Sequence, residues 1–570
     1  MTDRPMDVAE VLRRMRVSEL TRRRLVGIAA GGLIGVVTTR VAGAAPGAGA
    51  RGMAVRFQAD ATTLVIADNM ASGGFWLTFD PSWFYEINPL AAMNMVYEPL
   101  YHLPDPERPD LFEPLLADGM PETSADGTEV TIKLRPGVTF QHTGTEMTAT
   151  DWVFTLNRAK NLKGNPAFLA TDYWDSVEAV DPLTLRFTLG TPNPALVPIL
   201  SIPFLGVLDS AAVMEQGATD AADAAETDTA QEYLNENSHG TGPFTMAQWD
   251  VTGEVILERN EGYWGEAPVL ARLIWRNIED ANSQLQAVQA GEVDIAYSLD
   301  PDAAAGVKDD PSLQVLTSAT LAIEYLAMNQ TEEVGGPLAN RDVRLAIAQA
   351  VDYDGIISGL LAGAALRPAS VVPLPLPGSE EVQPEAYQTD LDAARASFAA
   401  SGFGEAELTL SYGAGEVAFG GVDLETLVTK IQADVQQIEG LTITLNPMDP
   451  NTRITEFRAG ALQFTISPWG PDYPDVQGYV EPFGRSNTVV ANRIGYANPR
   501  VDQLLDQAAS EPDAAARAGI YADVQRTLIE DAPYVVLYQP VDQKPARKSV
   551  QGATAHPFYQ IQLRGASKAE

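Results

Sequence analysis

Two hydrophobic periods alternate along the chain. Apolar residues recur at helical spacing over 343–351 and 424–438. Apolar and polar residues alternate one by one, as in strands with one buried face, at 130–134, 183–189, 408–412, 441–445 and 462–466. No unit of about 20–50 residues repeats, which argues against solenoids and propellers. The mixture of the two periods predicts α/β lobes.

The first 50 residues have the features of an export signal. The apolar stretch at 25–37 is 13 residues long, whereas a bilayer span needs about 20, so it suits the core of a signal peptide. Arg22 and Arg23 stand just before it in a run that resembles the twin-arginine export motif, and small residues at 41–50 offer a cleavage site. We expect 1–50 to be an export signal and flexible leader; a retained membrane anchor is the alternative.

The chain is strongly acidic and has no cysteine. Its 76 Asp and Glu against 38 Lys and Arg give a net charge of −38, which argues against a nucleic-acid partner, because phosphate contacts need a basic surface. Without cysteine there is no disulfide, no thiol nucleophile and no lipid on an N-terminal cysteine. We therefore expect a soluble periplasmic protein that is not lipid-anchored. The four histidines lie far apart and no cofactor motif occurs, so we expect no metal and no cofactor.

Catalytic motifs are missing from the sequence as well. It contains no G-x-S-x-G elbow, no H-E-x-x-H and no Walker A motif. Carboxylate pairs occur at every spacing in so acidic a chain, so they give no support to a glycosidase. We predict that the protein is not an enzyme. An exported hydrolase, either a glycosidase or a peptidase, is the alternative.

Six sequence blocks carry a resemblance to a known family. In chain order they are INPLAAMNMVYEPLY at 87–101; DGTEVTIKLRPGVTFQHTGTEMTATDWVFTLNR at 126–158; GTGPF at 240–244 with RNEGYWG at 259–265 and AVQAGEVDIA at 287–296; NRDVRLAIAQAVDYDGII at 340–357; WGPDYPD at 469–475; and NRIGYANPRVDQLL at 492–505. From about residue 88 onward the chain resembles the family 5 extracellular solute-binding proteins, which are the dipeptide- and oligopeptide-binding receptors of ABC importers.

The resemblance implies an α/β, periplasmic-binding-protein-like, two-lobed fold of type II in its three-domain variant, with mixed sheets and a hinge between the lobes. Mapped onto this chain, domain I comprises 51–100, 235–325 and 538–570. Domain II is inserted at 101–234, and domain III, the second lobe, is 326–537.

Two apolar runs with strand character, near 322–329 and 535–539, are expected to cross between the lobes. The resemblance then implies hinge closure around the ligand, followed by recognition of the closed form by a permease.

The segment at 469–475 is the candidate ligand site. The alternating strand 462–466 is expected to end just before Pro468, directly ahead of this segment, and ligands of α/β lobes bind at the carboxyl ends of strands. A carboxylate beside aromatic rings suits a cationic amine. The resemblance implies that Asp472 holds the α-ammonium group of the ligand, with Trp469, Gly470 and Tyr473 around it. A surface loop with a capping aspartate is the alternative.

Other residues near this motif bear on the ligand. Pro468 and Pro471 have no backbone N–H, which argues against full strand-like pairing with a peptide. Arg367 and Arg485 are candidates, by residue type only, for holding a terminal carboxylate of the ligand.

The predicted function is that of an exported, monomeric substrate-binding protein of an ABC importer. It captures a small solute, a peptide or another amine-bearing compound, by lobe closure and delivers it to permease subunits. Ligands left open are an oligosaccharide, an opine or a metal chelate. Presentation of a ligand to a membrane chemoreceptor also stays open.

Overall fold

The computed structural model describes residues 61–71, 76–297, 299 and 301–569. The predicted export signal, including Arg22 and Arg23, lies outside these residues. The chain from residue 58 onward forms one compact unit. Within the described part of the chain, no helix combines the length and the apolar composition needed to cross a membrane.

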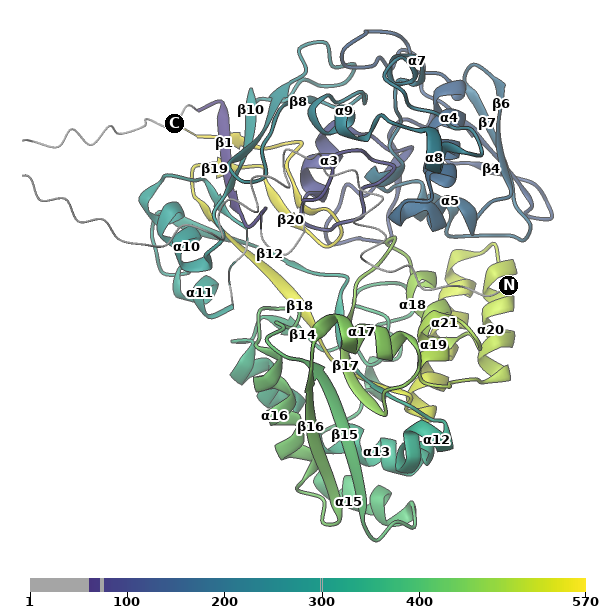
Figure 1. The fold of residues 1–570 in the computed structure, drawn as a ribbon, viewed down its shortest axis with the longest axis vertical. Helices are drawn as coiled ribbons and strands as arrows, with labels where there is room; N and C mark the ends of the chain where they lie inside the picture. The colour runs from purple at the N-terminus through teal and green to yellow at the C-terminus, as the bar shows by residue number, and fades with distance from the viewer. Residues whose placement is uncertain (1–60, 72–75, 298, 300, 570) are drawn as a thin grey trace, which may run out of the picture. The chain divides into compact units, whose positions relative to one another are not determined.

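A large mixed sheet of 12 strands organises the described chain. Figure 1 shows strand β18 between two groups of strands, one containing β15–β17 and the other containing β1 and β8–β10. Across the sheet the order is β16 (Leu441–Met448), β15 (Ala406–Gly413), β17 (Phe464–Trp469), β13 (Ile323–Met328), β18 (Tyr534–Arg547), β11 (Ile295–Ala296), β1 (Thr63–Asp68), β10 (Arg272–Asn277), β9 (Glu254–Arg259) and β8 (Phe244–Trp249), with β12 (Leu313–Ala319) and β14 (Ala365–Leu366) also paired to β18.

Strand β18 joins the two halves of this sheet. Its first residues, Tyr534–Tyr538, pair with β13, and residues 541–547 pair with β12. The short segment 320–322 separates β12 from β13. The two predicted crossing segments are therefore confirmed as strands, and they lie side by side in antiparallel pairing.

A second, smaller sheet has four strands in the order β4 (Glu122–Thr123), β5 (Glu129–Lys133), β7 (Thr184–Thr188), β6 (Ser176–Asp181). Helix α4 (Ala149–Leu162) begins at a capping box formed by Thr148 and Asp151, which satisfies backbone N–H groups at its first turn. It buries Trp152 and Phe154 and packs against β6. These elements fall within the predicted domain II, whose boundaries remain a prediction.

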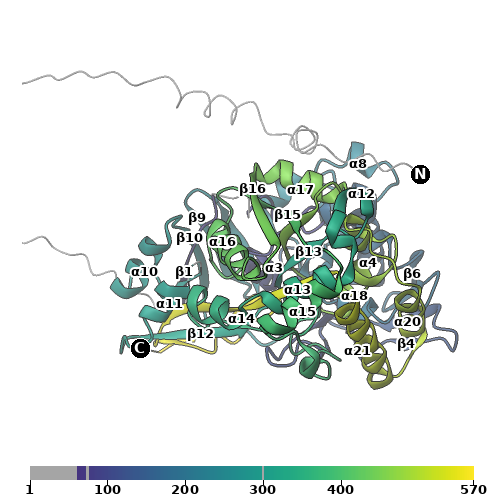
Figure 2. The same ribbon diagram turned by 90° about the horizontal axis from the view of Figure 1, so that it is seen from below.

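The two predicted amphipathic helices are present beside β15 and β16. Helix α13 (Arg341–Ala350) buries Val343 and Ile347. Helix α16 (Leu424–Val435) packs against β16, and Figure 2 shows the two next to each other from below. The side chain of Asn340 accepts a hydrogen bond from Asp342 N at 2.8 Å and so caps α13.

The strand before the candidate site is longer than predicted. The sequence placed its end before Pro468, but β17 continues to Trp469, where Pro468 and Trp469 pair with Glu324 and Ile323 of β13. On its other edge β17 pairs with β15 only at Phe464 and Thr465. A proline is tolerated in a strand where one edge has no strand partner, so the predicted end was wrong.

The remaining elements are short helices and strands around these sheets. The helices are α3 (Leu90–Val96), α5 (Phe168–Thr171), α6 (Leu196–Ile199), α7 (Ser210–Met214), α8 (Ala224–Thr227), α9 (Gln231–Glu236), α10 (Ala281–Ala290), α11 (Pro301–Gly306), α12 (Glu332–Gly335), α14 (Tyr353–Gly355), α15 (Leu391–Ala400), α17 (Pro450–Arg458), α18 (Gln477–Gly484), α19 (Val489–Arg493), α20 (Pro499–Ser510) and α21 (Ala514–Asp531). The strands are β2 (Tyr101–His102), β3 (Glu113–Pro114), β19 (Val550–Gln551), β20 (Thr554–His556), β21 (Gln560–Gln562) and β22 (Ser567–Lys568).

Candidate functional site

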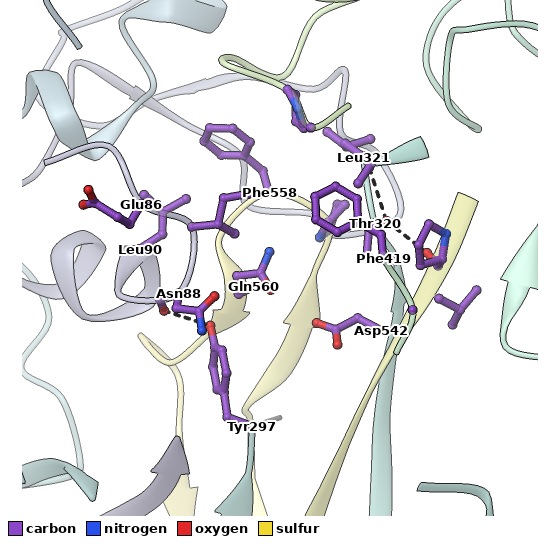
Figure 3. Close-up of a pocket in the computed structure, with 18 of the residues that line it drawn as sticks. Glu86, Asn88, Leu90, Tyr297, Thr320, Leu321, Phe419, Asp542, Phe558 and Gln560 are labelled. Atoms are coloured by element: carbon purple, nitrogen blue, oxygen red, sulfur yellow. Dashed lines mark hydrogen bonds between the residues drawn. The ribbon is translucent and has the colours of Figure 1, made fainter. Parts of the chain in front are cut away.

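A cavity of about 730 Å³ lies where the crossing strands meet the loop after β17. Its wall is built from segments far apart in sequence, several of which are labelled in Figure 3. These are residues 85–88 with Leu90; Phe204; Tyr297 and Leu299; 320–322; 419–421; 470–472; 540–544; and Pro557, Phe558 and Gln560. The crossing point of the sheet thus supplies part of the cavity wall.

Of the four residues predicted for the ligand site, Gly470 and Asp472 line this cavity. The phenol of Tyr85 donates a hydrogen bond to Oδ1 of Asp472, joining two segments that are 387 residues apart. Burial raises the pKa of Asp472, and the hydrogen bond from Tyr85 opposes that shift. Asp472 is therefore a largely desolvated carboxylate with a neutral donor as its partner.

Trp469 and Tyr473 lie next to the cavity but do not form its wall. The ring of Trp469 packs edge-on against Phe483 with centroids 5.2 Å apart, and its Nε1 donates to the carbonyl of Gly478 at 3.2 Å. Tyr473 is 2% exposed, and its hydroxyl accepts a hydrogen bond from the hydroxyl of Tyr173 at 3.1 Å. Both aromatic residues hold the loop that presents Asp472.

The two arginines considered for a ligand carboxylate lie elsewhere. The guanidinium of Arg367 sits 3.7 Å from the ring centroid of Tyr353. Arg485 directly follows α18 and pairs with Glu481 of that helix and, at 2.9 Å, with Asp506. Neither arginine lines the cavity.

Three charged residues of the wall were not found from the sequence: Glu86, Asp542 and Lys544. Lys544 Nζ lies 2.6 Å from Asp542 Oδ2 and 3.9 Å from the ring centroid of Tyr297. A sequence signal for this pair does exist. Residues 542–544 are three consecutive polar residues within a strand that is otherwise mostly apolar and buried, and such a run indicates a functional surface.

Most of the remaining wall is apolar. Leu90, Phe204, Leu321, Phe419 and Phe558 line it together with Pro471, Pro540 and Pro557. Hydrophobic walls with a small number of polar groups that fix orientation are typical of sites for small molecules. Among the described residues, no group of three or more His, Asp or Glu side chains is arranged to hold a metal ion.

Comparison with known families gives a match over most of the chain. The profile of the bacterial extracellular solute-binding proteins, family 5 Middle, matches residues 112–489. The probable D,D-dipeptide-binding periplasmic protein DdpA of Escherichia coli (strain K12) is 26% identical over 440 residues, which cover 77% of this chain and 81% of DdpA. The glutathione-binding protein GsiB of Pectobacterium atrosepticum is 27% identical over 436 residues, which cover 74% of this chain and 79% of GsiB.

Solved structures share the fold. HbpA2 from Haemophilus parasuis is 23% identical with a TM-score of 0.78, and the match covers 89% of this chain and 100% of HbpA2. A dipeptide-binding protein from Pseudoalteromonas sp. SM9913, solved in complex with Met-Leu, is 22% identical with a TM-score of 0.71, covering 89% of this chain and 100% of that protein. Together with the large mixed sheet, these likenesses confirm the predicted two-lobed α/β fold of the periplasmic binding proteins.

Proposed function

Because this chain belongs to the family 5 bacterial extracellular solute-binding proteins, whose members are transport receptors of ABC importers, we propose that it captures a small amine-bearing solute, a short peptide above all, in the cavity beside Asp472. The solute is held between the lobes, stabilises their closed arrangement and is passed to the permease. The relatives named for dipeptide and glutathione binding support a peptide-like ligand.

The observation that carries this proposal is the state of Asp472. Its carboxylate lines the cavity and is desolvated, and Tyr85 supplies a neutral donor to it. A ligand ammonium in the same place brings a full positive charge to the carboxylate, whereas the phenol of Tyr85 is a neutral donor. The ammonium group of a ligand therefore competes with Tyr85 for Asp472.

The proposal extends to export and assembly. Residues 1–50, with Arg22 and Arg23, act as a twin-arginine-type export signal. The mature chain works in the periplasm as a soluble monomer without a lipid anchor, and it has no enzymatic activity. The domain limits at 100, 234, 325 and 537 are part of the same proposal. So is the role of Trp469 and Tyr473, which support the Asp472 loop and do not touch the ligand.

Isothermal titration calorimetry tests the role of Asp472. Peptides selected from a di- and tripeptide library by thermal shift are titrated into the wild type and into Asp472→Asn. We expect the variant to lose at least about 2 kcal/mol of binding free energy, close to 30-fold in Kd, because a buried ion-pair partner is removed. N-acetylation of the same peptide is expected to weaken binding to the wild type by a similar factor, and to change little in the variant.

Asp475→Asn is the matched control. Asp475 belongs to the same loop and, like Asp472, is half-buried, but it does not line the cavity, and its carboxylate accepts a hydrogen bond from Gln477 N at 2.7 Å. Its replacement is expected to leave peptide affinity near the wild-type value. Equal affinity of Asp472→Asn and wild type for the free-amine peptide would remove Asp472 from the site.

A further inference from the structure

The charges in the cavity wall are unbalanced. The lining residues include three carboxylates, Glu86, Asp472 and Asp542, and one cation, Lys544. The cation is already neutralised, since its Nζ lies 2.6 Å from Asp542 and 3.9 Å from the ring centroid of Tyr297. The Lys544 side chain is 2% exposed, so water contributes little to its solvation. The wall therefore keeps two carboxylates without a cationic partner.

The two remaining carboxylates have neutral donors only. Oδ1 of Asp472 accepts from the Tyr85 hydroxyl, and Oε2 of Glu86 accepts from Tyr85 N at 3.1 Å. No Lys, Arg or His in the described part of the chain forms an ion pair with either of them. Burial raises the pKa of both carboxyl groups, as expected for carboxylates removed from water without a neutralising charge.

Both carboxylates contact the same residue, Tyr85, at its two ends. Aromatic rings lie around them: the Tyr85 ring is 5.8 Å from that of Phe204, and Phe204, Phe419 and Phe558 also line the cavity. Aromatic faces attract ammonium and guanidinium groups, and more strongly where water is excluded. Figure 3 shows Glu86 on the side of the cavity formed by residues 86–90 and Asp542 on the opposite side, formed by β18.

We propose that the cavity selects solutes with two positive groups, one held by Asp472 and the second by Glu86, such as a short peptide whose side chain is that of lysine or arginine. This inference rests on the proposed function and specifies its ligand class. Two half-buried carboxylates without a cationic partner make the empty site costly, and a dicationic ligand reduces that cost for both. An acidic side chain meets like charges and finds Lys544 already engaged, so it is rejected.

The test uses tripeptides of equal length that differ in one side chain. Ala-Lys-Ala, Ala-Gln-Ala and Ala-Glu-Ala, and the corresponding Ala-Ala-X series, are titrated calorimetrically into the full mature protein. We expect the lysine peptide of at least one series to bind 10-fold or more tightly than its glutamine counterpart, and the glutamate peptide to bind most weakly. Glu86→Gln should bring the affinities for the lysine and glutamine peptides to within about 2-fold of each other.

Asp542→Asn tests the charge preference of the cavity independently, and its expected effect is on the acidic peptides. It frees Lys544 from its carboxylate partner and should therefore raise affinity for the glutamate peptides several-fold. Thermal melting of both variants confirms that they are folded.

The outcomes separate this inference from the proposed function. Lysine and glutamine peptides that bind equally well to the wild type, with affinity lost in Asp472→Asn, would leave the amine-binding function standing and overturn the two-cation selectivity. A lysine preference that persists in Glu86→Gln would overturn the role of Glu86. Failure of all six peptides to bind would overturn both the selectivity and the peptide ligand.

Discussion

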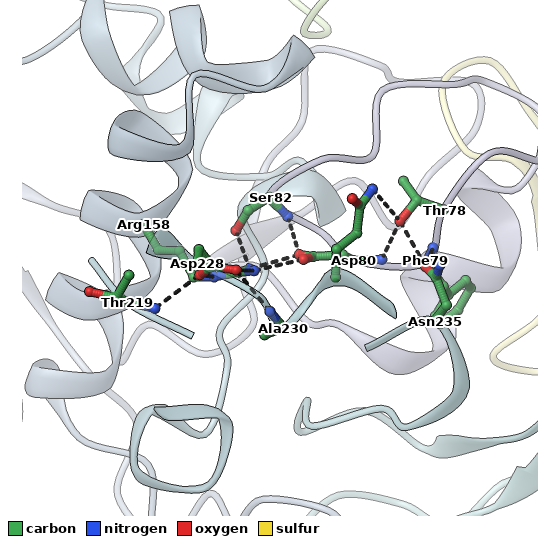
Figure 4. A network of polar contacts seen from close by, with 10 residues as sticks. Thr78, Phe79, Asp80, Ser82, Arg158, Thr219, Asp228, Ala230 and Asn235 are labelled. Atoms are coloured by element: carbon green, nitrogen blue, oxygen red, sulfur yellow. Dashed lines mark hydrogen bonds and ion pairs between the residues drawn. The ribbon is translucent and has the colours of Figure 1, made fainter. Parts of the chain in front are cut away.

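Replacing Arg158 by methionine is expected to lower the free energy of unfolding by about 3–5 kcal/mol. Arg158 is fully buried on α4 and bonds to two buried carboxylates: its Nη2 lies 2.7 Å from Asp80 and its Nε lies 2.8 Å from Asp228. Figure 4 shows this network, which Ser82 also joins. Without the guanidinium, two carboxylates stay in the interior with no opposite charge, and that accounts for the size of the loss.

Urea unfolding followed by circular dichroism measures this loss, and Arg186→Met is the matched control. Arg186 pairs with Glu178 at 3.1 Å, but both side chains are well exposed, so its loss should cost less than about 1 kcal/mol. Replacing the whole network, with Arg158→Met, Asp80→Asn and Asp228→Asn together, should recover part of the stability, because the uncompensated charges are then gone. Similar losses of unfolding free energy for Arg158→Met and Arg186→Met would show that the buried network contributes no more to stability than an exposed ion pair does.

Glu324→Gln is expected to remove a marked pH dependence of stability. Glu324 lies on β13, is 1% exposed and accepts a hydrogen bond from Phe419 N at 3.2 Å. Burial raises its pKa to about 8 from an ordinary value of 4.5, against smaller opposing effects of Phe419 N and Arg453. Between these two pKa values the folded protein holds a proton that the unfolded chain releases, so raising the pH favours unfolding.

Relative to Glu324→Gln, the wild type should therefore lose stability as the pH rises from about 4.5 to about 8. The slope is at most about 1.4 kcal/mol per pH unit, which gives a total of about 5 kcal/mol across the window. Below pH 4.5 and above pH 8 the two stability curves should run parallel. Urea unfolding of both proteins at half-unit steps of pH measures the difference, and a constant difference across the whole range would mean that Glu324 does not titrate in this window.

Much of the fold was predictable because local hydrophobic patterns indicate where its helices and strands lie. The alternating run at 408–412 became β15 and the helical stripe at 343–351 became α13, with Asn340 as its cap. The end of β17 was misplaced because Pro468 was treated as a strand breaker. Its tolerance depends on which neighbouring strands pair with it, and a single segment does not contain that information.

The candidate site was predictable only in part. Asp472 stands in a recognisable motif beside aromatic residues, but the aromatic residues that share its cavity come from other segments, Tyr85 and Phe204 among them, and not from the adjacent Trp469 and Tyr473. Glu86 gave no signal, because it lines the cavity only through the fold, which brings residues 85–88 next to the loop 470–472. Contacts of this kind arise from the tertiary fold and leave no periodicity in the sequence.

Strand β18 follows every other strand of the large sheet in chain order, and this has a consequence for how the sheet is assembled. This strand is the only link in the central sheet between β13 on one side and β11 on the other, among the described strands. A nascent chain that has emerged only as far as residue 530 has every other strand of both halves but lacks the one that unites them. The halves can therefore be joined only after β18 has been made, so the solute cavity, whose wall includes residues 540–544, is completed later than either half of the sheet.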